Sequence, residues 1–421
     1  MKGRYRTGDQ ALVREINLST VLRYLHSTAP LSRSGLAGLT GLNKTTVSSL
    51  VEELLDRGLV CEVGIDNSRT GRPATLLDLN PNAGAIIGVA LGVDFVAIVL
   101  TDFGGNIHWR RRQATDPAQS RETMLALTLD MAEEAVAANS DHGNLRLLGL
   151  GIATPGTVNV DEGFLIFSPN LQWHNVPYRD IFQARLPLPV MVDNDANAAA
   201  LAEHMFGAAR QAQTFVTVFA GVGVGGGLFL NGELYRGAGG FAGEIGHTNF
   251  TLEHYRRPCR CGQRGCWETT VAQDSVVERI RSRLVAGRQS LVSQLMAEHS
   301  SPPTLAMVIE AAHAGDAEAI EVLAETGHLL GVGVANLINI FNPEMVVLGG
   351  PLSTAAAYLL PAIQQAVEDS TLPEIRNQAE IVLSAFGADA SLVGAVALVV
   401  DDILAHPSGV ERLSRHPARV V

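Results

Sequence analysis

The sequence predicts an α/β protein in which an N-terminal winged helix-turn-helix precedes a larger domain of two lobes. Two observations predict it: three helical patterns and a β-hairpin fill residues 14–79, and a strand–hairpin–helix unit then occurs twice. At 421 residues the chain is also too long for one compact domain. We expect a DNA-binding domain at 1–80, a first lobe at 81–195 and a second lobe at 196–421, with the C-terminal segment packing partly back on the first lobe.

The first two helices are indicated by apolar spacing and by residues that begin or end a helix. A helical pattern over 14–28 stops at Pro30. Ser32 can then cap a short second helix in which Leu36 and Leu39 face inward.

A third helix begins at about Asn43 and ends at Gly58. Its apolar residues occur at i, i+3, i+4, i+7 and i+8, namely Val47, Leu50, Val51, Leu54 and Leu55. The second half of its outer face is acidic, so only the N-terminal half suits a major groove. We expect DNA contacts from Lys44, Thr45, Thr46 and Ser49. An ordinary packed helix of a three-helix bundle would show the same periodicity.

Two β-like stretches, 59–63 and 75–79, predict a wing around a polar turn that carries Arg72. Flanking Gly and Pro suit Arg72 to a minor-groove or backbone contact, although a plain surface turn would look alike. Seven Lys/Arg against two Asp/Glu leave +5 on residues 1–50 and therefore −17 on the rest of a chain with net charge −12. A basic head on an acidic body fits DNA binding.

The N-terminus is polar, and the long apolar runs are too short or interrupted for a membrane span. We therefore expect a cytoplasmic protein without a membrane partner.

Three of the four cysteines lie within eight residues, as Cys259, Cys261 and Cys266. With His247 they match a Cys₃His site for one structural zinc ion per chain, because four protein ligands leave no position for an activated water. Spacing alone also allows His254 as the fourth ligand. A disulfide or inert thiols are the competing interpretations, and a cytoplasmic setting disfavours the disulfide.

A strand end opens into an Ala-rich helix at Asn194 and Asp195. Polar residues at such a junction face the crevice of an α/β sheet, so Asp195 could bind a hydroxyl or accept its proton. Capping of the helix would use the same residues. The Gly-rich stretch 221–227 could cradle a phosphate or form a tight hairpin, and it lacks the Lys of a P-loop.

Together these segments resemble the ROK family of bacterial repressors and sugar kinases, over about residues 14–400. The matching motifs are 169–173 (PNLQW), 194–197 (NDAN), 237–247 (GAGGFAGEIGH), 259–268 (CRCGQRGCWE) and 339–350 (NIFNPEMVVLGG). The resemblance implies an actin/hexokinase-like (ribonuclease H-like) ATPase-type fold. It also implies sugar contacts from Asn194, Asp195, Glu244, His247 and Glu268, and zinc ligation by His247 with the three cysteines. His247 would serve both sites, which favours it over His254.

The sequence departs from the family's kinases where these bind ATP phosphates. Ala90 replaces an expected Asp, Val93 and Asp94 replace a Gly-Thr pair, and Val222 replaces a Thr. Phosphoryl transfer depends on stabilising the phosphate charge, so these changes predict a regulator that is not an enzyme.

We therefore expect a sugar-responsive transcriptional regulator of carbohydrate metabolism, a repressor that binds operator DNA as a homodimer or homotetramer. The alternative is an ATP-dependent sugar kinase, glucokinase-like, with Asp195 as general base. A scaffold that docks another protein is a third hypothesis, for which the sequence offers no positive feature.

Overall fold

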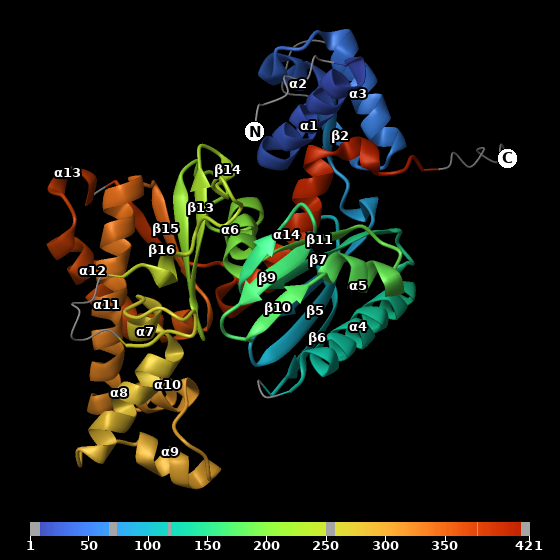
Figure 1. The fold of residues 1–421 in the computed structure, drawn as a ribbon. Helices are drawn as coiled ribbons and strands as arrows, with labels where there is room; N and C mark the ends of the chain where they lie inside the picture. The colour runs from blue at the N-terminus through green and yellow to red at the C-terminus, as the bar shows by residue number, and fades with distance from the viewer. Residues whose placement is uncertain (1–8, 67–73, 117–118, 250–256, 377, 414–421) are drawn as a thin grey trace.

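Three helices and a three-stranded sheet form the N-terminal domain of the computed structural model, which describes residues 9–66, 74–116, 119–249, 257–376 and 378–413 (Figure 1). The elements are α1 (Gln10–Thr28), β1 (Leu31–Ser32), α2 (Arg33–Thr40), α3 (Lys44–Asp56), β2 (Val60–Asp66) and β3 (Ala74–Leu79), and the strand order is β1-β3-β2. This is the predicted winged helix-turn-helix.

Local capping sets the helix boundaries in this domain. The Ser32 hydroxyl accepts a hydrogen bond from the Gly35 N–H (3.1 Å), and the Asn43 side chain accepts one from the Thr46 N–H (2.8 Å). Gly41 ends α2 at φ +71°, a left-handed conformation that favours glycine. The expectation that Leu39 faces inward was wrong: it is 46% exposed, because the two-turn helix α2 buries only the face that carries Leu36.

The first lobe is built on a five-stranded sheet with the order β11-β7-β4-β5-β6. Strands β4 to β6 form an antiparallel meander, and β7 and β11 add in parallel. Helices α4 and α5 and a small sheet, β10-β9-β8, complete the lobe. The bounds are β4 (Ala85–Leu91), β5 (Phe95–Asp102), β6 (Ile107–Ala114), α4 (Arg121–Ala138), β7 (Leu147–Thr154), β8 (Thr157–Asn159), β9 (Phe164–Ser168), β10 (Trp173–Val176), α5 (Tyr178–Arg185) and β11 (Val190–Asn194).

The second lobe repeats this arrangement, in the order β14-β13-β12-β15-β16. An antiparallel meander again precedes two parallel strands, so the internal repeat expected from the sequence is present. The bounds are β12 (Phe215–Ala220), β13 (Val224–Leu230), β14 (Glu233–Leu234), α7 (Glu268–Val271), α8 (Gln273–Val285), α9 (Val292–His299), α10 (Leu305–His313), α11 (Ala317–Phe341), β15 (Met345–Gly349), α12 (Ala356–Ser370), α13 (Pro373–Arg376) and β16 (Glu380–Leu383). None of the described helices is long and apolar enough to cross a membrane.

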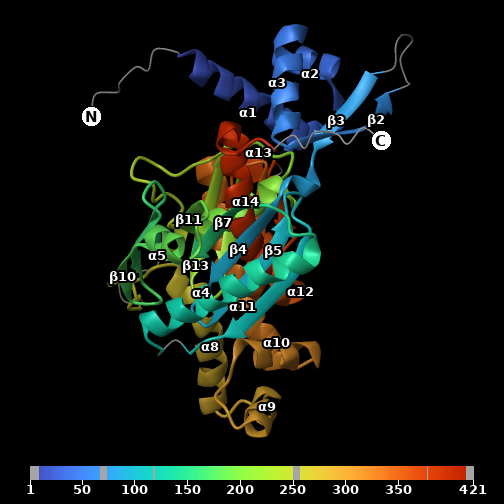
Figure 2. The same cartoon turned by 90° about the vertical axis from the view of Figure 1, so that its right-hand side faces the viewer.

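Two helices join the parts of the molecule. Helix α6 (Asp195–Met205) packs on β12 and β13, and α14 (Ala390–Ala405) packs on α6 and on β4 and β7. Figures 1 and 2 show α14, in red, descending from the N-terminal domain toward the junction of the lobes. The chain thus crosses from the second lobe back to the first before it reaches the N-terminal domain.

The C-terminal segment that follows α14 contacts the N-terminal domain directly. Within α14 itself, Asp401 forms an ion pair with Arg23 of α1 (3.1 Å). Beyond it, the Ser408 carbonyl accepts a hydrogen bond from Arg57 (2.9 Å), and the Leu413 N–H donates to the Asp56 carbonyl (2.9 Å). The C-terminal end of α3 is therefore held by the end of the chain.

Glycines make the close approach of α14 possible. A Cβ atom at Gly151 in β7 would lie 1.8 Å from the Ala395 carbonyl oxygen of α14, and one at Gly394 would lie 2.1 Å from the Ala198 carbonyl oxygen of α6. These are backbone atoms, which cannot move aside as the end of a side chain can.

We predict that Gly151→Ala lowers the free energy of unfolding by about 1–3 kcal/mol, because the methyl group overpacks this contact. Gly38→Ala is the control: Gly38 lies in α2 with open space around its Cα, so alanine should raise stability by about 0.5–1 kcal/mol. Thermal unfolding of both variants tests this. A Gly151→Ala protein as stable as the parent would contradict the packing described here.

Candidate functional site

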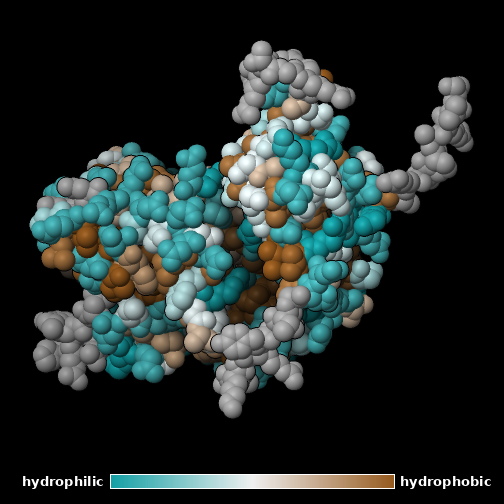
Figure 3. Space-filling view, turned by 90° about the horizontal axis from the view of Figure 1, so that it is seen from above, coloured by the Kyte–Doolittle hydropathy of each residue, from teal (hydrophilic) through white to brown (hydrophobic). Residues whose placement is uncertain are grey.

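A cavity with a volume of about 440 Å³ lies between the two lobes. Its size suits a small-molecule ligand. All five residues expected to contact a sugar line it, from both lobes: Asn194, Asp195, Glu244, His247 and Glu268. Figure 3, seen from above, shows a mainly hydrophilic surface with a recess between the lobes in which apolar residues gather.

Asn194 and Asp195 stand where β11 ends and α6 begins. The Asn194 Oδ1 caps α6 by accepting from the N–H groups of Ala196 (2.8 Å) and Asn197 (3.2 Å), and its Nδ2 donates to the Gly156 carbonyl (3.0 Å). Asn194 therefore keeps one amide hydrogen for a ligand. The Asp195 Oδ1 accepts from the Ala196 N–H (2.9 Å), and the residue lines the cavity.

The electrostatic setting of Asp195 is unusual for a carboxylate. Burial raises the pKa of Asp195 to about 6, and the negative charges of Glu244 and Glu268 act in the same direction. A ligand hydroxyl donating to this carboxylate would favour its charged form. The three carboxylates together make the cavity a set of acceptors suited to hydroxyl groups.

Glu268 and His247 connect the cavity to the cysteine loop. Glu268, the first residue of α7, is 8% exposed; its Oε2 accepts from the Val224 N–H (2.9 Å) and its Oε1 lies 3.6 Å from the Cys259 sulfur. The His247 Nδ1 lies 3.8 Å from the same sulfur, while its Nε2 lies 3.8 Å from a Glu244 oxygen. One edge of the imidazole thus faces the cysteines and the other faces the cavity.

His247, Cys259, Cys261 and Cys266 form the one His/Cys/Asp/Glu cluster with metal-binding spacing among the described residues. Their ligand atoms all lie within 4.8 Å of one another. In a tetrahedral site with metal–sulfur bonds of about 2.3 Å, two sulfurs lie about 3.8 Å apart. The Cys261 and Cys266 sulfurs are 3.7 Å apart, so the donor set fits a tetrahedral ion. His254, the alternative ligand, lies outside the described residues.

Four residues of α3, which spans Lys44–Asp56, are expected to meet DNA. Lys44, Thr45 and Ser49 are exposed and Thr46 is half-buried. The Ser49 hydroxyl accepts a long hydrogen bond from Arg14 (3.5 Å). Arg72 lies outside the described residues.

Sequence reasoning missed other polar groups around the cavity. Asn170 lines it, although it belongs to a motif that carried the family resemblance. The buried Asp193 and its partner Arg236 were also missed. Asp193 directly precedes the Asn194–Asp195 pair, which was the one available signal.

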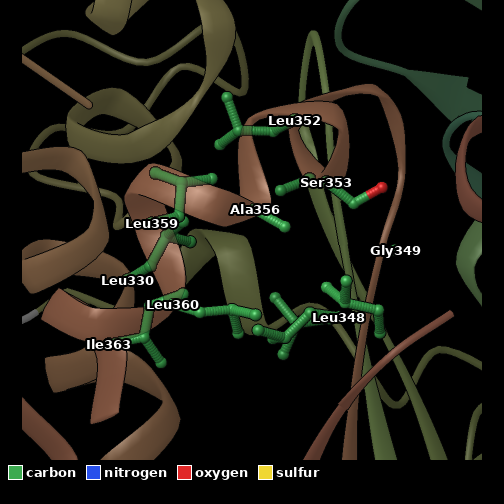
Figure 4. Close-up of a pocket in the computed structure, with 12 residues that line it drawn as sticks. Leu330, Leu348, Gly349, Leu352, Ser353, Ala356, Leu359, Leu360 and Ile363 are labelled. Carbon is green, nitrogen blue, oxygen red and sulfur yellow. The ribbon is translucent and has the colours of Figure 1, made fainter. Parts of the chain in front are cut away.

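A second hollow between α12 and the second sheet does not compete for the ligand. Figure 4 shows its apolar lining, which includes Leu330, Leu348 and Ile363. Its volume of about 20 Å³ holds one or two water molecules. The interlobe cavity is therefore the candidate ligand site.

The architecture defines a two-lobed, sugar-kinase-like protein with a winged helix-turn-helix at its N-terminus. Comparison with known proteins agrees: residues 86–402 match the ROK family. The chain belongs to the ROK family.

Among its relatives is the xylose repressor of Caldicellulosiruptor bescii, 34% identical over 402 residues, which cover 95% of this chain and 99% of that protein. A crystal structure of a ROK family transcriptional regulator, a homologue of the Escherichia coli MLC protein, has a TM-score of 0.80 and 27% identity and covers 93% of this chain and 98% of that one. A ROK family glucokinase from Streptomyces griseus, solved with glucose and AMPPNP, has a TM-score of 0.66 and 30% identity, covering 75% of this chain and 99% of the kinase.

The cluster geometry predicts one tightly bound metal ion per chain, measurable by elemental analysis of the purified protein. Cys261→Ser should lose most of it, because a hydroxyl is a poor replacement for a thiolate ligand. Cys61→Ser is the matched control, since Cys61 lies in β2 outside the cluster. Full metal content in Cys261→Ser would rule out the cluster as the binding site.

Proposed function

We propose that this protein is a sugar-responsive transcriptional repressor of carbohydrate metabolism genes. The observation that carries the proposal is that one chain joins a winged helix-turn-helix to an interlobe cavity lined by three carboxylates. The similarity to the xylose repressor supports it because that similarity spans 95% of the chain and so includes both parts.

The sugar is bound through the five residues at the cavity, with Asp195, Glu244 and Glu268 accepting from its hydroxyl groups. Such acceptors select a sugar because a missing or misplaced hydroxyl leaves a buried polar group unpaired. D-xylose is the first sugar to test, given the name of the relative, and D-glucose, the ligand of the similar kinase, is the second.

The metal is zinc, held by His247, Cys259, Cys261 and Cys266 in a structural role. A closed set of four protein ligands supplies rigidity and no reactive water. Ligation through Nδ1 would fix the tautomer of His247 and aim its Nε2 edge at the cavity, so metal binding prepares the sugar site.

Catalysis of phosphoryl transfer is not part of this proposal. Ala90, Val93 and Val222 lack the groups that bind ATP phosphates in the kinases. In addition, the Phe95 ring lies directly over Gly92, within 2.3 Å of where a Cβ would stand, and the Arg112 guanidinium covers the ring at 3.7 Å. The Phe95 ring therefore packs against the turn between β4 and β5. An ADP-release assay with D-xylose and D-glucose should show no turnover; robust turnover lost in Asp195→Asn would favour the kinase alternative.

Helix α14 offers the route from sugar to DNA. Ser391 near its start lines the cavity, and Asp401 near its end pairs with Arg23 of the DNA-binding domain. Closure of the lobes on a sugar would shift α14 and re-space the DNA-binding domains of a homodimer or homotetramer on paired half-sites.

Asp195→Asn should weaken sugar binding about 10- to 100-fold, because it removes a charged acceptor of a hydroxyl group. Operator binding without sugar should be unchanged. The operator fragment is DNA from the region upstream of the protein's own gene. Titrating this DNA with the variant measures operator affinity, and titrating sugar into the variant–DNA complex measures sugar affinity. Asp141→Asn, an exposed position in the first lobe, is the control. Parental sugar affinity in Asp195→Asn would contradict its assignment.

Lys44→Ala should weaken operator binding and reduce the slope of log K against log salt by about 0.9, the value for one lost phosphate contact. Fluorescence anisotropy at several salt concentrations measures this slope. Arg281→Ala removes a charge from an exposed site in the second lobe and should leave the slope unchanged. Equal slopes for Lys44→Ala and the parent would show that Lys44 makes no phosphate contact with the operator.

A further inference from the structure

Asp193 is a buried carboxylate that belongs to none of the proposed sugar, zinc or DNA contacts. Its side chain is only 1% exposed, at the end of β11 in the first lobe, one residue before Asn194. Its Oδ1 accepts from the Asn194 N–H (2.7 Å) and from the Asn197 Nδ2 (3.2 Å). Its charge is therefore anchored at the same strand–helix junction that presents Asn194 and Asp195 to the cavity.

The cation that neutralises Asp193 comes from the other lobe. Arg236 follows β14 of the second lobe, and its guanidinium forms an ion pair with the Asp193 Oδ2. This ion pair joins the strand that precedes Asn194 to the segment that precedes Glu244.

Arg236 also closes the loop that carries the other half of the site. Its carbonyl accepts from the Ala242 N–H (3.0 Å), and the Gly243 carbonyl accepts from the Gly226 N–H (3.0 Å). Gly243 has φ +95°, and a Cβ there would lie 2.1 Å from the Gly226 carbonyl oxygen, so the loop lies tightly on β13. Glu244 follows immediately. One end of this loop is thus fixed to Asp193 and the other to β13.

From this geometry we infer that Arg236 and Asp193 are positioning residues for sugar recognition. Their ion pair sets the distance between the Asn194–Asp195 junction and the loop that carries Glu244 and His247. The inference rests on the proposed function, since it assumes that these residues bind sugar. A buried charge left without its partner is costly, so loss of Arg236 would let the loop and the junction separate to hydrate Asp193.

The test uses full-length protein and isothermal titration with D-xylose, then D-glucose, well below the unfolding temperature of every variant. Arg236→Met should weaken the binding of whichever sugar the parent binds about 10- to 100-fold, as loss of an orienting partner commonly does. Arg236→Lys keeps the charge and should recover much of the affinity. Arg185→Met breaks a comparable but exposed ion pair, with Glu133, and should change nothing.

A double variant separates positioning from a role in stability alone. Asp193→Asn with Arg236→Met removes both charges, so its unfolding temperature should rise above that of Arg236→Met, while its sugar affinity should stay low because the anchor is still missing. Bound metal should equal that of the parent throughout.

Two results would overturn the inference: sugar binding by Arg236→Met within twofold of the parent, or affinity that follows the unfolding temperature through the series and recovers in the double variant. Failure of the parent to bind any sugar is a different outcome. It would remove the proposed function and this inference with it.

Discussion

Backbone-to-backbone packing of α14 is the constraint on which the rest of the structure depends. At Gly151 and Gly394 the helix lies so close to β7 and α6 that no side chain fits between them. Because α6 begins at the interlobe cavity and α14 ends against the DNA-binding domain, this packing joins three parts that are far apart in sequence. A rigid helix held at both ends can pass a small movement of the lobes to the DNA-binding domain, whereas a flexible linker would absorb it.

Within the second lobe, His247 joins two parts of the structure, as α14 does for the whole molecule. Its Nδ1 faces the cysteine sulfurs and its Nε2 faces Glu244, so the imidazole belongs to both the metal cluster and the cavity. Glu268 does the same through its two oxygens, one near Cys259 and one on the Val224 N–H. The cysteine loop and the cavity therefore share residues. A bound metal ion would make this side of the cavity more rigid.

How far the sequence predicts this structure depends on whether the signal is local. Ser32 indicated the start of α2 because a cap acts within three residues, and apolar spacing placed the start of α3 near Asn43, which caps it. The two meanders were predictable because each is a run of strands joined by short turns. Leu39 was misplaced because apolar spacing does not say how wide a face a short helix buries. Asp193 and Arg236, 43 residues apart, escaped notice because their pairing depends on how two lobes meet.

If sugar binding and operator binding are coupled through this chain, each ligand must change the affinity for the other. The dissociation constant for operator DNA is measured with and without saturating sugar, and that for sugar with and without saturating operator. Each ligand should change the affinity for the other by the same factor, in the range of about 5 to 150. A protein that binds both ligands, each with an affinity unchanged by the other, would contradict this coupling.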